Sequence, residues 1–105
     1  MDIKRFDEII DAWAREEAIN AENAKRKDDE RGHSIALMKQ SMYSTMLKTL
    51  GHNAPKAMAG CINDLEKRRE KQIQRGDADA ADRISIQIAC IQRVQQLVVE
   101  LGGEA

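Results

Sequence analysis

The second half of the chain carries a nearly complete set of helix start and stop signals, and these restrict the fold more than any other feature. Asn53 and Pro55 are typical of a helix start, and Gly76-Asp77 ends one helix and begins another. Gly102-Gly103 then provides a glycine stop. The sequence therefore predicts an antiparallel helical hairpin over residues 53–103.

Apolar stripes at helical spacing lie between these signals and support the hairpin. The first helix, expected over Ala54–Arg75, carries Met58, Cys61, Ile62 and Leu65 on one face. The second helix, expected from Asp77 onward, carries two adjacent stripes: Ala81, Ile84, Ile88, Ile91 and Val98, then Cys90, Val94, Leu97 and Leu101. If the turn centres between Arg75 and Gly76, Cys61 lies level with Cys90. So wide an apolar arc needs cover on two sides, which we expect from the first helix and from residues 3–50 or a second copy.

The first half of the chain has weaker signals, and two arrangements fit it. A helix begins with Asp2 as its N-cap, and a second helix is expected over Ser34–Leu50, with Ser34 as N-cap and Gly51 as a left-handed stop. We expect the break between them near Arg31–His33. One uninterrupted helix over residues 2–50 is the alternative, because the helical apolar spacing continues through the polar segment.

Composition favours helix throughout. The 105 residues include one proline and three aromatic side chains, and they are rich in Ala, Leu, Ile, Glu, Lys, Arg and Gln. The sequence therefore predicts a small all-α bundle of three to four helices, built on the 53–103 hairpin. We expect a single domain over residues 1–105, in which residues 1–50 form the interaction or oligomerisation half.

Several classes of function find no support in the sequence. The N-terminus is charged, no stretch approaches the roughly 18 apolar residues of a membrane span, and the two cysteines fit reduced thiols, so we expect a cytoplasmic protein. No phosphate-binding loop, paired Cys or His motif, or nucleophile–base pair is present. His33 and His52 are expected in loops, away from the cysteines. We therefore expect no enzyme activity, no metal and no cofactor.

The candidate partner-binding residues are apolar and lie in the first half of the chain. Methionine adapts to irregular partners, and aromatic side chains anchor helices in grooves. The candidates are Phe6, Ile10, Trp13, Met38, Met42, Tyr43 and Met46. The alternative for the same residues is that they pack the core of the bundle.

A basic run in the first helix of the hairpin offers a nucleic-acid interpretation. It consists of Lys67, Arg68, Arg69, Lys71 and Arg75. Glu66 and Glu70 interrupt the run, and no aromatic residue lies near it for base stacking. A solvated helix face is therefore favoured over a nucleic-acid surface.

These patterns favour a non-enzymatic protein–protein interaction module, such as an adaptor, inhibitor or assembly factor. The apolar residues slightly exceed what one thin hairpin buries, which favours a homo-oligomer assembled through residues 3–50. Small size and the lack of catalytic motifs also fit an accessory protein of a phage or mobile element. Nucleic-acid association through residues 67–75 is the alternative.

Overall fold

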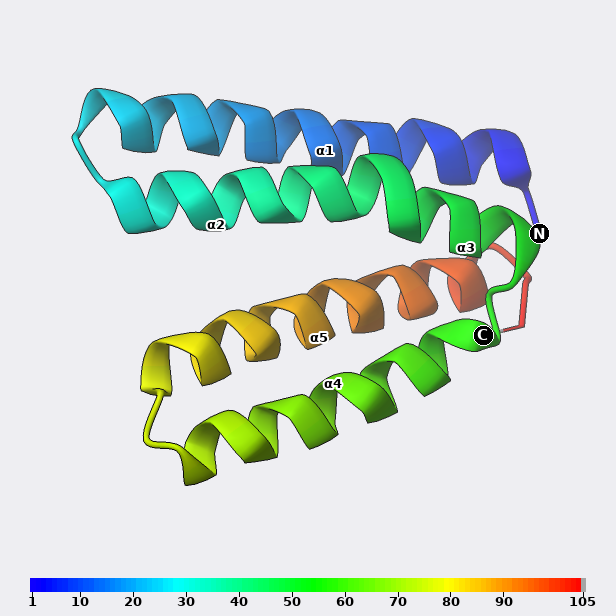
Figure 1. The fold of residues 1–105 in the computed structure, drawn as a ribbon. Helices are drawn as coiled ribbons and strands as arrows, with labels where there is room; N and C mark the ends of the chain where they lie inside the picture. Colours follow the sequence, from blue (N-terminus) through cyan, green and yellow to red (C-terminus); the bar gives the residue numbers. More distant parts are fainter. Residues whose placement is uncertain (105) are drawn as a thin grey trace.

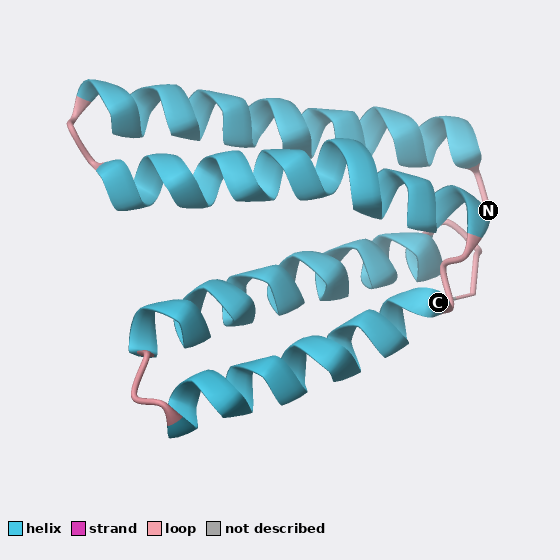
Figure 2. Ribbon diagram, in the orientation of Figure 1, coloured by secondary structure: helices cyan, strands magenta, loops and turns pink. Residues whose placement is uncertain are grey.

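The computed structural model describes residues 1–104, and every regular element within that range is a helix (Figures 1 and 2). The elements are α1 (Ile3–Arg26), α2 (Glu30–Ser41), the π-helical turn η1 (Met42–Met46), α3 (Leu47–Asn53), α4 (Ala57–Gln74) and α5 (Ala78–Glu100). Because α2, η1 and α3 follow one another without interruption, the described chain forms four rods. The predicted small all-α bundle is confirmed.

Local capping explains where several of these helices begin and end. The Asp2 carboxylate accepts a hydrogen bond from the Arg5 N–H at 3.1 Å, and the Asp77 carboxylate accepts one from the Ala80 N–H at 3.0 Å. Gly76 and Gly102 follow the ends of α4 and α5 with φ of 76° and 86°, a conformation that favours glycine. The expected caps at Asp2 and Asp77 and the stops at Gly76 and Gly102 are confirmed.

The break between the first two helices lies earlier than the sequence predicted. The turn occupies Lys27–Asp29, so both the break near Arg31–His33 and the uninterrupted helix over residues 2–50 were wrong. Asp28 adopts a left-handed conformation with φ of 55°, which aspartate tolerates better than most residues. The Asp29 carboxylate then accepts a hydrogen bond from the Gly32 N–H at 2.9 Å and caps α2. His33 consequently lies in a helix and not in a loop.

The end of the second rod also differs from the expectation. Ser34 lies within α2, and Gly51 lies within α3 without a positive φ, so neither acts as the predicted cap or stop. Gly51 is instead buried against the Phe6 ring, where a side chain would collide with the ring. The helix therefore continues to Asn53, which places His52 in α3 as well. The predicted helix start at Asn53 was wrong, because Asn53 ends α3 and α4 begins at Ala57 with Lys56 as its N-cap.

The four rods form a flat arrangement with Cα extents of 40 × 34 × 17 Å. α1 packs along α2, α5 packs against α3 and the neighbouring rods, and α4 lies along α5 (Figure 1). α2–α3 and α5 run in the same direction, whereas α1 and α4 run in the opposite one (Figure 1). α5 is therefore the central helix, and α4 lies at one edge.

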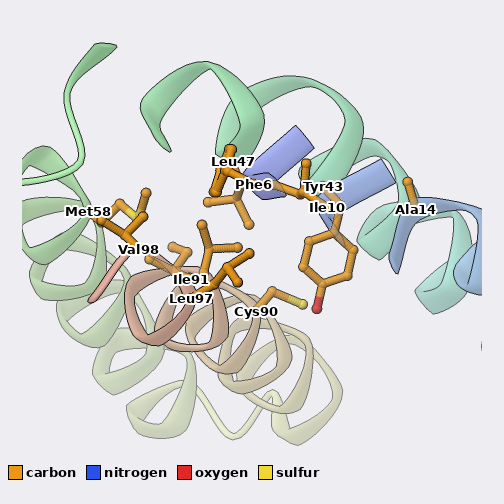
Figure 3. Packing of buried hydrophobic residues seen from close by; sticks show 11 residues of the cluster. Phe6, Ile10, Ala14, Tyr43, Leu47, Met58, Cys90, Ile91, Leu97 and Val98 are labelled. Carbon is orange, nitrogen blue, oxygen red and sulfur yellow. The ribbon is translucent and has the colours of Figure 1, made fainter. Parts of the chain in front are cut away.

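The core fills the space between α1, the η1–α3 segment and α5 (Figure 3). Its most deeply buried side chains are Phe6, Ile10, Leu47, Met58, Ile91, Val94 and Val98. Ala14, Tyr43, Cys90 and Leu97 complete it. The second apolar stripe of α5 is thus covered by α1 and the η1–α3 segment of the same chain. Burial of this apolar surface is the main source of stability.

Polar contacts join the rods outside the core. Arg31 of α2 donates a hydrogen bond to Asp79 of α5 at 2.8 Å, and this contact lowers the pKa of the Asp79 carboxyl. Glu17 is the buried charged residue of α1. Its carboxylate accepts a hydrogen bond from Asn20 at 2.9 Å and lies 3.9 Å from the Lys39 ammonium. The Glu17–Lys39 pair joins α1 to α2, and the Arg31–Asp79 pair joins α2 to α5.

Candidate functional site

α4 is the least buried helix of this fold. Met58 is the one buried residue among its 18, whereas the 23 residues of α5 include seven buried ones. Cys61, Ile62 and Leu65 pack against the core but remain half-buried. α4 therefore leaves part of its apolar side uncovered, on the side that faces η1.

An open groove of about 350 Å³ occupies this uncovered region. Its first wall comes from η1, its second wall from α4 and its floor from α5. The lining residues are Met42 and Met46 of η1, Cys61, Asp64, Leu65 and Arg68 of α4, and Gln87 and Ile91 of α5. We call this feature the α4 groove. Its surface is mainly apolar, with charged groups only along the α4 wall.

The π-helical turn places two methionines on the groove side of the second rod. The Leu47 N–H bonds to the Met42 carbonyl, five residues back. The hydroxyls of Ser44 and Thr45 donate to the carbonyls of Gln40 and Ser41, a contact that bends helices. Tyr43 and Leu47 then point into the core, while Met42 and Met46 line the groove. Single π-turns inside α-helices are frequent at functional sites.

Two opposite charges stand one helical turn apart on the α4 wall. Asp64 and Arg68 are both exposed, and within residues 1–104 neither forms an ion pair. Pairs with the same spacing elsewhere do close: Glu22 lies 3.6 Å from Arg26, and Asp79 lies 3.0 Å from Arg83. The carboxylate and guanidinium at the groove are therefore both available to a bound partner.

The predicted partner-binding residues fall into two groups. Met42 and Met46 line the groove, and Met38 lies beside it, with its sulfur 3.4 Å from the Gln87 amide nitrogen that donates to it. Phe6, Ile10 and Tyr43 are buried in the core, so their assignment to a partner surface needs correction. Their side chains pack against α3 and α5 of the same chain (Figure 3).

Trp13 packs in a cluster that joins α1, η1 and α5, so its ring is not left open for a partner. Its ring meets Tyr43 edge to face with centroids 5.6 Å apart, and the Arg93 guanidinium lies 3.7 Å from its centroid. Arg93 also donates to the Tyr43 hydroxyl at 3.5 Å. Burial of the hydroxyl, reinforced by its contact with Cys90, raises the pKa of Tyr43 to about 12 (Figure 3). The cluster fixes α1 and η1 on α5.

The basic run of α4 does not form one continuous surface. Lys67, Lys71 and Arg75 are exposed, and Arg68 lies at the groove. Arg69 instead is half-buried and donates to the Ser85 hydroxyl of α5 at 3.3 Å. The five predicted nucleic-acid residues are therefore divided between solvent, groove and helix packing.

Five groove residues had no assigned binding role in the sequence: Cys61, Asp64, Leu65, Gln87 and Ile91. A signal for the site was present, because the apolar stripe of α4 is short for a helix of 18 residues. Over residues 1–104, no three His, Cys, Asp or Glu side chains converge as a metal site, and Cys61 and Cys90 are free thiols. No helix in this range combines the length and apolar character needed to cross a membrane.

The fold and site together define an all-α bundle with an apolar, charge-edged groove at its least buried helix. No protein-family model, curated protein or solved structure matches the chain. The geometry of the α4 groove is therefore the basis for the functional proposal.

Proposed function

We propose that this protein is a non-enzymatic protein–protein interaction module that binds its partner in the α4 groove, as an adaptor, inhibitor or assembly factor does. The observation that carries the proposal is the open apolar groove between η1 and α4. Methionine side chains adapt their shape to a partner, and Met42 and Met46 form one wall. Burial of such an apolar surface favours a complex, and the loss of motional freedom on association offsets part of that gain.

The groups around the groove support binding more than chemistry. Cys61, Asp64, Arg68 and Gln87 supply its polar atoms, and its lining contains no histidine to act as a base toward Cys61. Helical apolar segments are the usual ligands of grooves between helices, because their side chains at successive turns fill the groove. Asp64 and Arg68 then provide orientation and specificity.

The test is partner capture by the wild-type protein and two variants with the same chemical change. Met46→Arg places a charge in the groove wall, and Leu37→Arg places one on α2 outside the groove. Met46 and Leu37 are 41% and 45% exposed, so neither change disturbs the core. We expect proteins from the native cells that bind wild type and Leu37→Arg but are lost with Met46→Arg. Equal capture by all three folded baits would refute the proposal.

Nucleic-acid association is the alternative proposal, supported by the exposed cations Lys67, Arg68, Lys71 and Arg75. Phosphate binding weakens steeply as salt rises, whereas apolar partner binding does not. Retardation of duplex DNA or single-stranded RNA at low salt, lost on raising the salt concentration, would favour this alternative. We expect no retardation, because Asp64, Glu66 and Glu70 repel phosphate from the same helix.

A further inference from the structure

We infer that the partner in the α4 groove is a second copy of this chain, with the two α4 helices packed antiparallel across a twofold axis. In this arrangement Asp64 of each copy lies opposite Arg68 of the other. The inference rests on the proposed function, because it names the occupant of the same groove. It places α4 at the centre of the dimer interface, with Met42 and Met46 as the part of residues 3–50 that takes part.

The charge order on α4 carries the inference. A twofold interface presents the same patch on both sides, so it is favourable only when the patch complements itself. An antiparallel pair centred between residues 64 and 68 brings each Asp64 opposite an Arg68 and creates two equivalent ion pairs. Both groups are exposed and form no ion pair within residues 1–104, so the monomer leaves them available.

The shape of α4 permits a close approach. The residues on its groove side recur at helical spacing, Cys61 on that side is small, and Ala57 lies one helical turn before Cys61. Gly60 beside them has open space around it, since a Cβ added there meets no atom within 4 Å. An approaching helix therefore meets few long side chains before it reaches Leu65 and the η1 wall.

The symmetry also explains how one contact covers both grooves. The molecule is flat, with its smallest extent 17 Å, and α4 lies at its edge (Figure 1). When two copies face each other, the α4 of one occupies the groove between η1 and α4 of the other. Met42 and Met46 of each copy then contact the second α4. A single association thus completes the burial of both edge helices.

The remaining cations of α4 favour the antiparallel direction. Lys71 and Arg75 are exposed near the C-terminal end of the helix. In an antiparallel pair centred near residue 66, the two Lys71 side chains lie at opposite ends, separated by roughly 15 Å at 1.5 Å per residue. That separation exceeds the Debye length of about 8 Å at physiological salt, so their repulsion is largely screened. A parallel pair would place them side by side.

Charge reversal combined with mixing tests the inference directly. Asp64→Arg makes the patch basic and Arg68→Asp makes it acidic, and both changes lie at exposed positions. We expect the wild type to dimerise in sedimentation equilibrium and each variant to dissociate at least about tenfold more readily. The two variants mixed in equal amounts should form a heterodimer, because the arginines at positions 64 and 68 of one copy then face the aspartates at positions 68 and 64 of the other. The double variant should again form a homodimer.

Matched controls separate this interface from general charge effects. Glu66→Arg makes the same charge change on a different face of α4, and Arg15→Asp makes the opposite change on the exposed side of α1. We expect both to dimerise like the wild type. In spectra of protein labelled with ¹³C at the methionine methyls, Met42 and Met46 should shift with protein concentration, while Met1 should not.

Two results would overturn the inference. One is a wild type that remains monomeric up to roughly 500 µM, and the other is a dimer that both reversals and their mixture leave unchanged. The proposed function is tested separately by Met46→Arg. If partner capture still depends on Met46 while the chain is monomeric, the groove binds another protein. If neither capture nor dimerisation depends on Met46, both proposals fail.

Discussion

α4 and α5 are the two arms of one hairpin, yet they have very different surroundings. α5 lies between α4 on one side and α1 with the η1–α3 segment on the other, and seven of its residues are buried. α4 contacts the rest of the molecule mainly through α5 and buries Met58 alone. The difference indicates that α5 determines the fold, whereas α4 has apolar and charged surface left for association.

The same substitution in the two helices should separate these roles most strongly. Leu97 of α5 is 4% exposed, and Leu65 of α4 is half-buried at the groove. We expect Leu97→Ala to lower the free energy of unfolding by about 2–5 kcal/mol, because it leaves a cavity in the core. Leu65→Ala should lower it by only about 1 kcal/mol, in proportion to its smaller burial. Urea unfolding of both variants measures the difference, and equal losses would contradict the comparison.

High pH should destabilise the packing of Tyr43 against α5 without any mutation. Burial raises the pKa of Tyr43 from 10.0 to about 12, so the folded chain keeps a proton that the unfolded chain loses. Stability should therefore fall as pH rises from about 10 to 12, by up to roughly 3 kcal/mol at 1.36 kcal/mol per pKa unit. Below pH 10 this contribution is fully present.

Tyr43→Phe provides the control for this effect, because phenylalanine has no proton to lose. Other groups also titrate in alkali, so the informative quantity is the difference between the two stability curves. We expect wild type and Tyr43→Phe to diverge between pH 10 and 12, with the wild type losing more. Parallel curves over that range would mean that the Tyr43 hydroxyl ionises without loss of the fold.

Gly51→Ala probes the close contact between α1 and α3. Gly51 is in a helix, where alanine is normally the better residue by about 1 kcal/mol. A Cβ at this position would, however, collide with three atoms of the fully buried Phe6 ring. We expect a net loss of about 1–3 kcal/mol in unfolding free energy from this overpacking. A stabilised variant would show that the Phe6 ring moves aside without penalty.

Local signals explain what the sequence predicted well, and tertiary contacts explain what it missed. Asp77 and Gly76 act within one turn of the chain, so the sequence predicted the start of α5 correctly. The left-handed turn at Asp28 and the packing of Gly51 against Phe6 were not predicted, because the break was expected near Arg31–His33 and Gly51 was expected to end its helix. The sequence predicted Met42 and Met46 as partner residues, but not the π-turn that places them at the groove or the bonds that the Ser44 and Thr45 hydroxyls donate to backbone carbonyls there.

The short apolar stripe of α4 indicated limited burial, but the sequence did not show how this helix is placed among the others. Its stripe of Met58, Cys61 and Leu65 indicates an apolar face but not how much of that face the neighbouring rods cover. Only the packed arrangement shows that α1 and the η1–α3 segment cover α5 and leave α4 at the edge (Figure 1). The placement of Asp64 and Arg68 along the groove emerges at the same step.

Gly60→Ala is the smallest expected effect and the counterpart of Gly51→Ala. Gly60 is inside α4, and an added Cβ meets no atom within 4 Å. We expect the unfolding free energy to rise by about 0.5–1 kcal/mol, because alanine loses less backbone entropy than glycine and creates no contact that must adjust. An added methyl group should thus destabilise the fold at Gly51, where it meets Phe6, and stabilise it at Gly60 in α4. A loss at both positions in urea unfolding would mean that α4 is packed as closely as the core, and the distinction between the two helices would fail.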